Sequence, residues 1–576
     1  MAESTAPGWP AVSLAKAHEI LTAPGSPFEM AEADIRGRRM RIWKNAPPTL
    51  RDVFLTGRGF SERIFLVHED ERVTFEAFAR AVLKLSEWMQ AQGVSKGDRV
   101  AIVMRNLPEW PVSFYAAIML GAIATPLNGW WSGEELLYGL KDSGAKFLIA
   151  DGDRFARIAD HVGECPALEK IVVTRAVPAR GIAALESIIG EPGSWKDIPD
   201  RPVPSVAIDP EDDASILYTS GTTGNSKGAI QTHRNSTCAI LAAMFAGARN
   251  FVRRGEPVPT PDPDLQRAML ISIPFFHTTG THAILCPALA TGAKIVMMRR
   301  FEPVRAMQLI ERERITTAGG VPTIAWQIIE HPERSKYDLS SLEAVSYGGA
   351  PASSELVKRI VEVFPKSAPG IGWGMTETTS TFTSHSAEDY RNRPESAGPC
   401  IPVCDMKIVD DAGATLPANS VGELWVRGPD VVRGYWNKPE ATEKAFEGEW
   451  LKTGDLAKID EEGFLFIVDR KKDMLIRGGE NIYCIEIEEV LYRHPAVMDA
   501  GVIGLQHRTL GEEPVAVVTL KSGMEASEEE LRAFVAEHLA AFKVPVRVAF
   551  SSEPLPRNAP GKIMKPQLRS FFEPQA

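Results

Sequence analysis

Cysteines are scarce in this chain, and their scarcity excludes a disulfide-stabilised protein. Six cysteines are spread over 576 residues, so no disulfide framework is expected, and a reducing cytoplasm is the predicted location. Cys400 and Cys404 form the closest pair, but no other cysteine or histidine lies at zinc-site spacing from them. We therefore interpret both as packing residues rather than metal ligands.

Long apolar runs and an excess of positive charge are also missing. The longest apolar stretch, residues 116–127, is interrupted by Gly121 and Pro126 and is too short to span a bilayer. The N-terminal residues 1–10 lack the basic start and the apolar run of a signal peptide. The formal net charge is -11, which disfavours nucleic acids and acidic membrane surfaces as partners.

The length of the chain and the order of its apolar segments predict a multidomain α/β protein. A chain of 576 residues exceeds one hydrophobic core, so about two to four domains are expected. The first fifty or so residues show little pattern beyond a candidate edge strand at 39–43. Apolar residues then recur at helical spacing over 74–92, a strand is predicted at 99–104, and helix and strand alternate up to residue 347. Such alternation is typical of largely parallel sheets.

The pattern changes near residue 406. Short strands separated by Gly, Pro and Asp turns indicate a small β-rich subdomain, and they lie at 407–409, 422–426 and 464–468. A charge run at 469–473 is typical of a junction, and in the unit that follows, Pro514 is expected to begin a strand. The predicted domains are residues 1–471 and residues 472–576.

The most informative run that is present reads Tyr-Thr-Ser-Gly-Thr-Thr-Gly-Asn-Ser-Lys-Gly, at residues 218–228. Its glycines let the backbone turn tightly and aim N–H groups at one point, and its hydroxyls and Lys227 add donors for the same anion. The natural ligand of such a loop is a polyphosphate. The spacing differs from that of a Walker A loop, because Lys227 stands three residues after Gly224 and is followed by Gly228. Taken alone, the run also fits a flexible surface loop.

Four further stretches carry chemistry that suits a nucleotide. Small residues at 348–351 leave room for a flat ring, and the stretch 372–377 offers an indole face and the carboxylate of Glu377 for Mg²⁺. Asp455 is suited to accept hydrogen bonds from ribose hydroxyls, and Lys562 lies on a loop framed by Pro and Gly. Each also has a structural alternative. Residues 348–351 fit a simple turn and Trp373 a core residue. Asp455 fits the cap of a turn, and Lys562 fits a solvated lysine.

In this order the motifs resemble those of the adenylate-forming acyl-CoA synthetase family, which includes aryl-CoA ligases, firefly luciferase and the adenylation domains of peptide synthetases. The resemblance spans residues 74–565 and implies an α/β fold. A large N-terminal domain of two β/α subdomains plus a small β-barrel would precede a hinged, smaller α+β C-terminal domain, with Lys472 at the hinge. The matching motifs lie at residues 218–228, 347–351, 372–377, 422–435, 453–455, 469–482 and 556–562.

The resemblance implies a ligase that uses ATP, Mg²⁺ and coenzyme A. A carboxylic acid would attack the α-phosphate of ATP to form an acyl-adenylate, and the thiol of coenzyme A would then displace AMP. The implied catalytic residues are Thr222, His277, Glu377 and Lys562, with Glu377 as the magnesium ligand. The implied nucleotide contacts are Thr219, Ser220, Gly221, Thr222, Thr223, Gly224, Lys227, Gly349, Ala350, Pro351, Gly372, Trp373, Gly374, Met375, Thr376, Asp455, Ile467, Arg470, Lys562, Gly478 and Gly479.

Four positions depart from the family pattern. Ser226 replaces the usual proline before the loop lysine, which predicts a more mobile loop. Trp373 replaces a tyrosine and keeps an aromatic face. Ile371 stands where many members carry an amide or acid that reads adenine, so that contact must come from the backbone or elsewhere. Cys484 stands where proline is common.

The acid that the resemblance implies is defined only as hydrophobic. His277 matches an active-site histidine of acyl- and aryl-CoA ligases, and the aspartate that peptide synthetases place there is absent, which argues against an amino-acid substrate. A medium- or long-chain fatty acid and a bulky aryl or polycyclic acid both fit. Space for it is attributed to Gly280, Gly319, Gly320, Gly348 and Gly349, and apolar walls to Val321, Trp326 and Met375.

Several alternatives stay open on the sequence alone. The acyl group could pass to a carrier protein or enter a luciferase-like oxidation instead of reaching coenzyme A. A non-catalytic nucleotide-binding protein would lack Lys227, Glu377 or Lys562, and all three are present. His277 also fits a core histidine, and His282 fits one better than it fits a metal ligand. Both a monomer and a homodimer are compatible with the resemblance.

Overall fold

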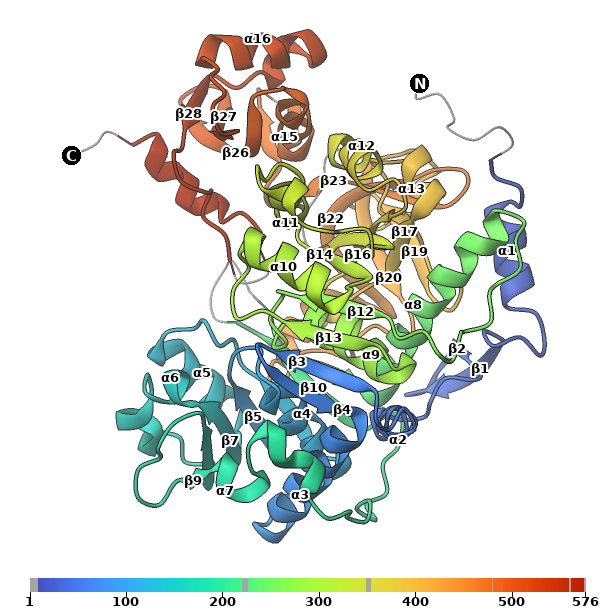
Figure 1. Cartoon of the computed structure of the whole chain (residues 1–576). Coiled ribbons are helices and arrows are strands. Elements are labelled where there is room, and N and C mark those ends of the chain that lie inside the picture. The colour runs from blue at the N-terminus through green and yellow to red at the C-terminus, as the bar shows by residue number, and fades with distance from the viewer. Residues whose placement is uncertain (1–8, 220–225, 349–353, 479, 559–560, 574–576) are drawn as a thin grey trace.

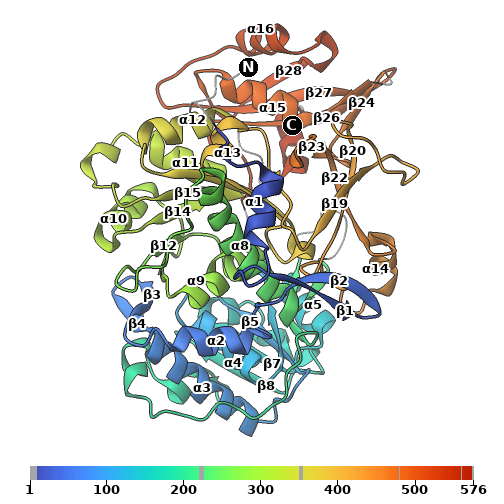
Figure 2. The same cartoon turned by 90° about the vertical axis from the view of Figure 1, so that its right-hand side faces the viewer.

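The computed structural model describes residues 9–219, 226–348, 354–478, 480–558 and 561–573. Its strands form four large sheets and a two-stranded ribbon, with helices packed around them. The C-terminal unit lies above the other sheets in Figures 1 and 2 and has an apolar core of its own. This arrangement confirms the predicted α/β class with a smaller C-terminal domain.

The first large sheet carries the stem of the glycine-rich run. Its seven strands lie in the order β11-β10-β6-β5-β7-β8-β9, and all pairs are parallel except the edge pair β10–β11. The central strands are buried on both faces, which explains their continuous apolar sequences. The strands are β5 (Arg99–Val103), β6 (Ile123–Pro126), β7 (Phe147–Asp151), β8 (Lys170–Thr174), β9 (Ala183–Ala184), β10 (Asp213–Tyr218) and β11 (Gly228–Thr232). The helices of this part are α2 (Leu50–Arg58), α3 (Phe75–Ala91), α4 (Glu109–Met119), α5 (Gly133–Ser143), α6 (Gly152–Phe155), α7 (Leu185–Ile189) and α8 (His233–Arg253).

The second large sheet includes a hairpin that precedes the first sheet in the sequence. Its eight strands lie in the order β17-β16-β15-β14-β12-β13-β3-β4, and β3 pairs in parallel with β13. The strands are β3 (Ile64–His68), β4 (Glu71–Thr74), β12 (Ala268–Ile271), β13 (Lys294–Met297), β14 (Thr317–Gly320), β15 (Ala344–Gly348), β16 (Ala368–Trp373) and β17 (Thr383–Ser386). The helices are α9 (Cys286–Thr291), α10 (Pro303–Glu313), α11 (Pro322–Ile329), α12 (Ser354–Val363) and α13 (Ala387–Asn392).

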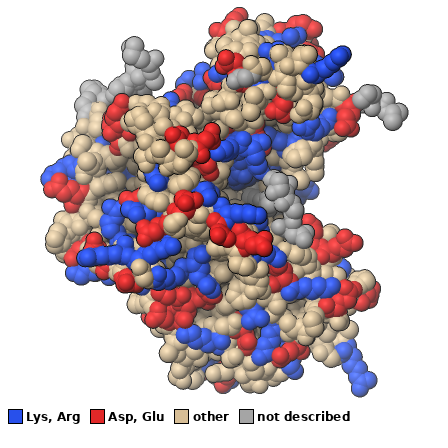
Figure 3. Space-filling model, turned by 180° about the vertical axis from the view of Figure 1, so that it is seen from behind, with Lys and Arg blue, Asp and Glu red and all other residues tan. Residues whose placement is uncertain are grey.

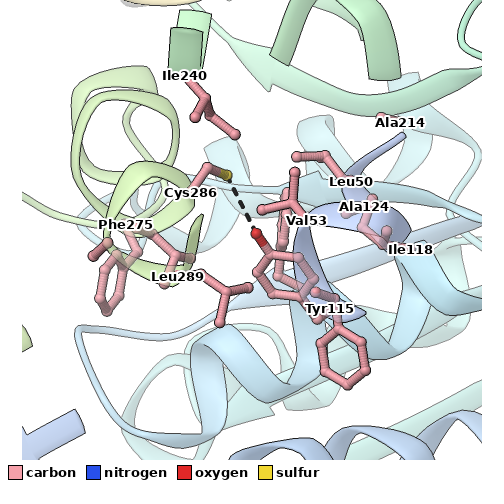
Figure 4. Close-up of a cluster of buried hydrophobic side chains, with 14 of the residues drawn as sticks. Leu50, Val53, Tyr115, Ile118, Ala124, Ala214, Ile240, Phe275, Cys286 and Leu289 are labelled. Carbon is pink, nitrogen blue, oxygen red and sulfur yellow. Dashed lines mark hydrogen bonds between the residues drawn. The ribbon is translucent and has the colours of Figure 1, made fainter. Parts of the chain in front are cut away.

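One apolar core joins these two sheets. In Figure 4, Tyr115 of α4 points toward Cys286 at the start of α9, and its O–H donates to the sulfur at 3.5 Å. Leu50 and Val53 of α2 and Leu289 of α9 pack in the same cluster, and each is at most 1% exposed. Because these side chains come from helices of both sheets, the two β/α subdomains are held together as one body.

The β-rich subdomain predicted after residue 406 is a six-stranded antiparallel sheet, and a separate five-stranded sheet follows it. The six strands are β18 (Gly398–Pro399), β19 (Asp405–Val409), β20 (Gly422–Arg427), β21 (Phe446–Glu447), β22 (Trp450–Ile459) and β23 (Phe464–Arg470), with α14 (Pro439–Ala445) alongside. The C-terminal unit contains β24 (Leu475–Arg477), β25 (Glu480–Ile482), α15 (Cys484–Arg493), β26 (Val497–His507), β27 (Gly511–Leu520), α16 (Glu528–His538) and β28 (Arg547–Phe550).

Two details differ from the sequence-based expectation. The poorly patterned N-terminal segment contains α1 (Leu14–Leu21) and the antiparallel ribbon of β1 (Met30–Ile35) and β2 (Arg38–Trp43). Helix α1 buries only Leu14, Ala17 and Leu21, and three apolar positions give too weak a period to recognise. Strand β27 begins at Gly511 rather than Pro514, because its hairpin with β26 continues past the proline.

The surface shows no separation of charge on the face drawn in Figure 3. Acidic and basic side chains are intermixed over that face. In the part of the chain that the structure describes, no helix combines the length and the apolar character needed to cross a membrane.

Candidate active site

The described ends of the glycine-rich loop are held close together by the β10–β11 hairpin. The Thr219 N–H donates to the Lys227 carbonyl at 2.9 Å, and the Lys227 N–H donates to the Thr219 hydroxyl at 3.4 Å. The loop therefore leaves and re-enters the sheet at one fixed point. The predicted contacts Ser220, Gly221, Thr222, Thr223 and Gly224 lie outside the described residues.

A buried carboxylate braces this stem. The Tyr218 O–H donates to Asp142 at 2.9 Å, and the Lys438 ammonium lies 2.7 Å from the other oxygen of the same carboxylate, whose side chain is 5% exposed. The Tyr138 O–H donates to the Ser226 carbonyl at 2.9 Å. Main-chain restraint at Ser226 thus comes from Tyr138 in place of a proline ring, and the two residues are too far apart in the sequence for a local pattern to reveal the contact.

Strand β16 ends at the second predicted motif. Gly372 pairs with Gly348 of β15, so the two backbones lie side by side with no side chain between them. A methyl group at Gly374 would lie 1.6 Å from the Ser380 carbonyl oxygen, so only glycine is compatible with this turn. The Thr376 carbonyl accepts a hydrogen bond from the Gln231 side chain at 3.1 Å, which ties the motif to β11. Gly349, Ala350 and Pro351 lie outside the described residues.

Glu377 follows this turn and lies beside Tyr435. Its carboxylate is 7% exposed and accepts the Tyr435 O–H at 2.7 Å through one oxygen. The Lys227 ammonium lies 5.0 Å from the centre of the Tyr435 ring. The lysine and the carboxylate therefore meet the same tyrosine from two sides.

Three of the predicted nucleotide contacts form one cluster. The Trp373 indole N–H donates to one oxygen of Asp455 at 2.8 Å, and Arg470 Nε lies 3.2 Å from the other oxygen. Trp373 also packs edge-on against Phe382, with the ring centres 5.9 Å apart. Ile467 is half-buried on the adjacent strand β23. The tryptophan at a position where the family has tyrosine thus gains an anchor on Asp455.

Hydrogen bonds join the described residues at the two ends of the loop that carries Lys562. The Asn558 side chain accepts the Lys562 N–H at 2.8 Å, and the Asn558 N–H donates to the Lys562 carbonyl at 2.9 Å. Arg557 binds both the Gly561 carbonyl and the Asp499 carboxylate, each at 2.6 Å. These bonds hold Asn558 and Lys562 side by side on the C-terminal domain.

Gly561, next to Lys562, contacts the N-terminal domain. A methyl group at Gly561 would lie 2.5 Å from Val321, just before α11. Burial, followed by the positive charge of Arg470, lowers the pKa of Lys562 to about 8, and the carboxylates of Asp455 and Glu377 oppose this shift. The structure therefore brings Lys562, from the end of the chain, together with Glu377, Asp455 and Arg470 in one site.

His277 lies in the same neighbourhood. Burial, reinforced by the charge of Lys562, lowers the pKa of His277 to about 3, so its ring is neutral at physiological pH. The Thr279 N–H donates to His277 Nδ1 at 3.3 Å, which leaves the ring hydrogen on Nε2. His277 can therefore donate one hydrogen bond to an acid. His282, in contrast, is a core histidine whose Nε2 lies 3.1 Å from the Ser236 hydroxyl.

The prediction that Gly280 and Gly319 leave space for the acid is wrong. Methyl groups at Gly280 and Gly319 would lie 2.2 Å from the Pro274 carbonyl oxygen and 1.6 Å from the Ser346 carbonyl oxygen, so backbone already fills both positions. Trp326 is 5% exposed, and the Lys521 ammonium of the C-terminal domain lies 5.5 Å from its ring centre. It forms part of the contact between domains.

Gly478 is held elsewhere, in the turn between β24 and β25. Its N–H donates to the Leu510 carbonyl at 2.7 Å, within the C-terminal domain, and Gly479 lies outside the described residues. Nearby, the Cys484 N–H donates to Asp469 and its thiol donates to the Asp473 carbonyl at 3.2 Å. A proline at this position would lack the N–H bond, so Cys484 ties the junction between domains to α15.

Two family models match the chain. The AMP-binding enzyme model covers residues 54–436, and the AMP-binding enzyme C-terminal domain model covers residues 486–562. The chain belongs to the AMP-binding enzyme family. This AMP-binding enzyme is 33% identical over 531 residues to a long-chain-fatty-acid–CoA ligase of Bacillus subtilis, with 88% of this chain and 92% of the relative covered.

Solved structures agree with this assignment. An anthranilate CoA ligase bound to anthranoyl-AMP is 27% identical and superposes with a TM-score of 0.80 over 91% of this chain and 96% of that chain. An o-succinylbenzoate CoA synthetase of Bacillus subtilis, in complex with ATP and magnesium, is 31% identical, with a TM-score of 0.74 over 91% and 99% of the two chains. The predicted family and enzyme class, an AMP-forming acid–CoA ligase, are confirmed, as are ATP, Mg²⁺ and coenzyme A.

Sequence reasoning did not assign roles to several residues of this AMP-binding enzyme that meet the site. Tyr435 is the last residue of the family-like stretch 422–435, but only the structure shows that it contacts Glu377 and Lys227. Asp142 and Tyr138 lie on α5, far from the loop in sequence, and nothing local marks them. Arg299 and Arg300 follow β13 after one intervening residue and line a separate pocket, and two adjacent cations beyond a buried strand are a signal that could have been used.

The lowered pKa of Lys562 predicts a pH dependence of the first half-reaction. The ammonium form is present below about pH 8, so kcat/KM for ATP–pyrophosphate exchange should fall as the pH rises through that value. Lys562→Arg keeps its charge over this range, and its residual activity should lose the alkaline limb. An alkaline limb that is unchanged in Lys562→Arg would assign the titration to another group.

Proposed function

We propose that the chain activates a bulky, hydrophobic carboxylic acid as an acyl-adenylate and transfers the acyl group to coenzyme A. The observation that carries this proposal is the position of Lys562, which reaches from the C-terminal domain into a site with Glu377, Asp455 and Arg470. An ammonium group there can neutralise charge that develops between the acid and the α-phosphate as pyrophosphate leaves.

The described residues around the site suit magnesium and nucleotide. One oxygen of Glu377 is engaged by Tyr435, and the other forms no hydrogen bond with the described residues, so it can ligate Mg²⁺ beside phosphate oxygens and water. Lys227 and the loop from Thr219 would hold the β- and γ-phosphates. Trp373, Asp455 and Arg470 would hold the nucleoside. Magnesium, when bound, supplies positive charge to the phosphates.

The acid is expected to be uncharged apart from its carboxylate. His277 is neutral and can donate a single hydrogen bond, and no described residue beside it supplies a carboxylate for an amino group. Relatives act on a long-chain fatty acid, anthranilate and o-succinylbenzoate by name. We therefore propose a medium- or long-chain fatty acid or a bulky aryl acid, without a choice between them.

A second concave site supports coenzyme A as the acceptor. Arg105, Arg299, Arg300 and Arg305 line a pocket of about 290 Å³, together with Glu69 and two apolar side chains. It lies past the carboxyl ends of β5 and β13, where α/β sheets commonly bind ligands. Arg305 is paired with Glu69 at 2.7 Å, whereas Arg105 and Arg300 have no ion pair within the described residues. Their charge suits the phosphates of a nucleotide thiol such as coenzyme A.

The two half-reactions should respond oppositely to two substitutions. Lys562→Ala should reduce acyl-adenylate formation by about 10²- to 10³-fold and largely spare thioester formation from supplied acyl-adenylate. Lys472→Pro should do the reverse, because it stiffens the proposed hinge between residues 1–471 and 472–576 after adenylation. Pyrophosphate exchange and single-turnover thioester assays measure the two steps. Equal losses in both steps for either variant would contradict the proposed rotation.

The arginine pocket has its own test. Arg105→Ala should raise the KM for coenzyme A by about tenfold, the cost expected for a lost charged hydrogen bond, and should leave ATP–pyrophosphate exchange unchanged. Arg314→Ala, at an exposed site paired with Asp338, is the matched control and should behave like the native protein. An unchanged KM for coenzyme A in Arg105→Ala would remove the pocket from the proposal.

The acid class is tested with a panel. Fatty acids of graded length, aryl acids and α-amino acids are supplied with ATP and Mg²⁺, and pyrophosphate and AMP release are measured with and without coenzyme A. Hydrophobic acids should drive release, amino acids should not, and repeated turnover should require coenzyme A. Equal rates of repeated turnover with and without coenzyme A would favour a different acyl acceptor.

A further inference from the structure

Tyr435 lies between two charged groups of opposite sign. Its O–H donates to Glu377 at 2.7 Å, and the Lys227 ammonium lies 5.0 Å from the centre of its ring. Within the described part of the chain, neither Lys227 nor Glu377 forms an ion pair with another side chain. The two charged groups thus contact the same aromatic side chain without forming an ion pair with each other.

The backbone fixes this ring in place. The Ile230 N–H donates to the Gly434 carbonyl at 3.1 Å, and the Trp436 N–H donates to the Gly228 carbonyl at 2.7 Å. Residues 434–436 are therefore hydrogen-bonded along β11, next to the point where the glycine-rich loop re-enters the sheet. The Tyr435 N–H is bound in turn by the Thr442 hydroxyl at 2.9 Å. Tyr435 has little freedom to move away from either charge.

The separation has a chemical consequence. A lysine and a glutamate that pair directly must be pulled apart before the lysine can bind a phosphate or the glutamate a metal ion. A tyrosine hydroxyl instead occupies one carboxylate oxygen with a neutral hydrogen bond, and the ring face holds the ammonium by a cation–π contact. The other oxygen of Glu377 then forms no hydrogen bond with the described residues, and Lys227 is not tied up in an ion pair with it.

We propose that Tyr435 is a positioning residue that holds the magnesium ligand Glu377 and the phosphate-binding Lys227 apart and oriented for Mg·ATP. This inference rests on the proposed function, since it takes Glu377 and Lys227 as ligands of the metal and the phosphates. It concerns only how they are held, and Tyr435 itself does not touch the reacting atoms.

Two substitutions separate the two contacts. Tyr435→Phe keeps the ring and removes only the O–H, so the Mg²⁺ concentration for half-maximal ATP binding should rise by about tenfold, at the lower end of the loss seen for residues that support metal ligands. Its affinity for ATP at saturating Mg²⁺ should stay within about twofold of native. Tyr435→Leu removes the ring as well, lets Lys227 reach Glu377, and should weaken ATP binding even at saturating Mg²⁺.

The measurement is calorimetric titration of the full chain with a non-hydrolysable ATP analogue over a range of Mg²⁺ concentrations, which needs no knowledge of the acid. Tyr337→Phe is the matched control, because the Tyr337 hydroxyl forms no hydrogen bond with the described residues, and it should match the native protein. Thermal unfolding midpoints of all variants verify folding.

The outcomes separate this inference from the function itself. A native protein that does not bind the analogue with Mg²⁺ would overturn the proposed function. A native protein that binds, with the same Mg²⁺ dependence in Tyr435→Phe, would overturn only the role of Tyr435. Equal behaviour of Tyr435→Leu and Tyr435→Phe would show that the ring does not separate the charges.

Discussion

The approach of one lysine of the C-terminal domain to the charged groups Glu377, Asp455 and Arg470 of the N-terminal domain is the interaction on which the site depends. Lys562 loses hydration there, and Arg470 adds repulsion, while Asp455 and Glu377 only partly compensate. A phosphate group is the partner that would complete this charge balance. Asn558 binds the backbone of Lys562 and Arg557 binds that of Gly561, and a donor that is held in place loses less entropy on meeting its partner than a mobile one.

The N-terminal half of the site rests on close backbone contacts. Gly374 lies against the Ser380 carbonyl, and Gly348 faces Gly372 across two parallel strands. Such contacts bring strand ends and turns together at one edge of the sheet, where backbone groups and a few side chains can face a ligand. The buried cluster around Tyr115 and Cys286 keeps the two subdomains in fixed relation, so both walls of the site have a rigid support.

The structural role of each residue that departs from the family pattern is shown by its hydrogen-bond partner. Ser226 loses the stiffness of proline, but Tyr138 holds its carbonyl. Trp373 gains a bond to Asp455, and Cys484 donates an N–H that proline would lack. The interpretation of Gly280 and Gly319 as open space was wrong for the same reason, since the backbone that fills these positions comes from other parts of the chain.

The sequence by itself determined the α/β class, the change to a β-rich region and the motif residues, because hydrophobic period, turn residues and motif spacing are local properties. Tertiary structure alone decided that β3 joins the second sheet, that Asp142 and Tyr138 brace the glycine-rich loop, and that Tyr435 stands between Lys227 and Glu377. These contacts join residues that are far apart along the chain. Their geometry follows from the packing of whole sheets and domains, which no short window of sequence encodes.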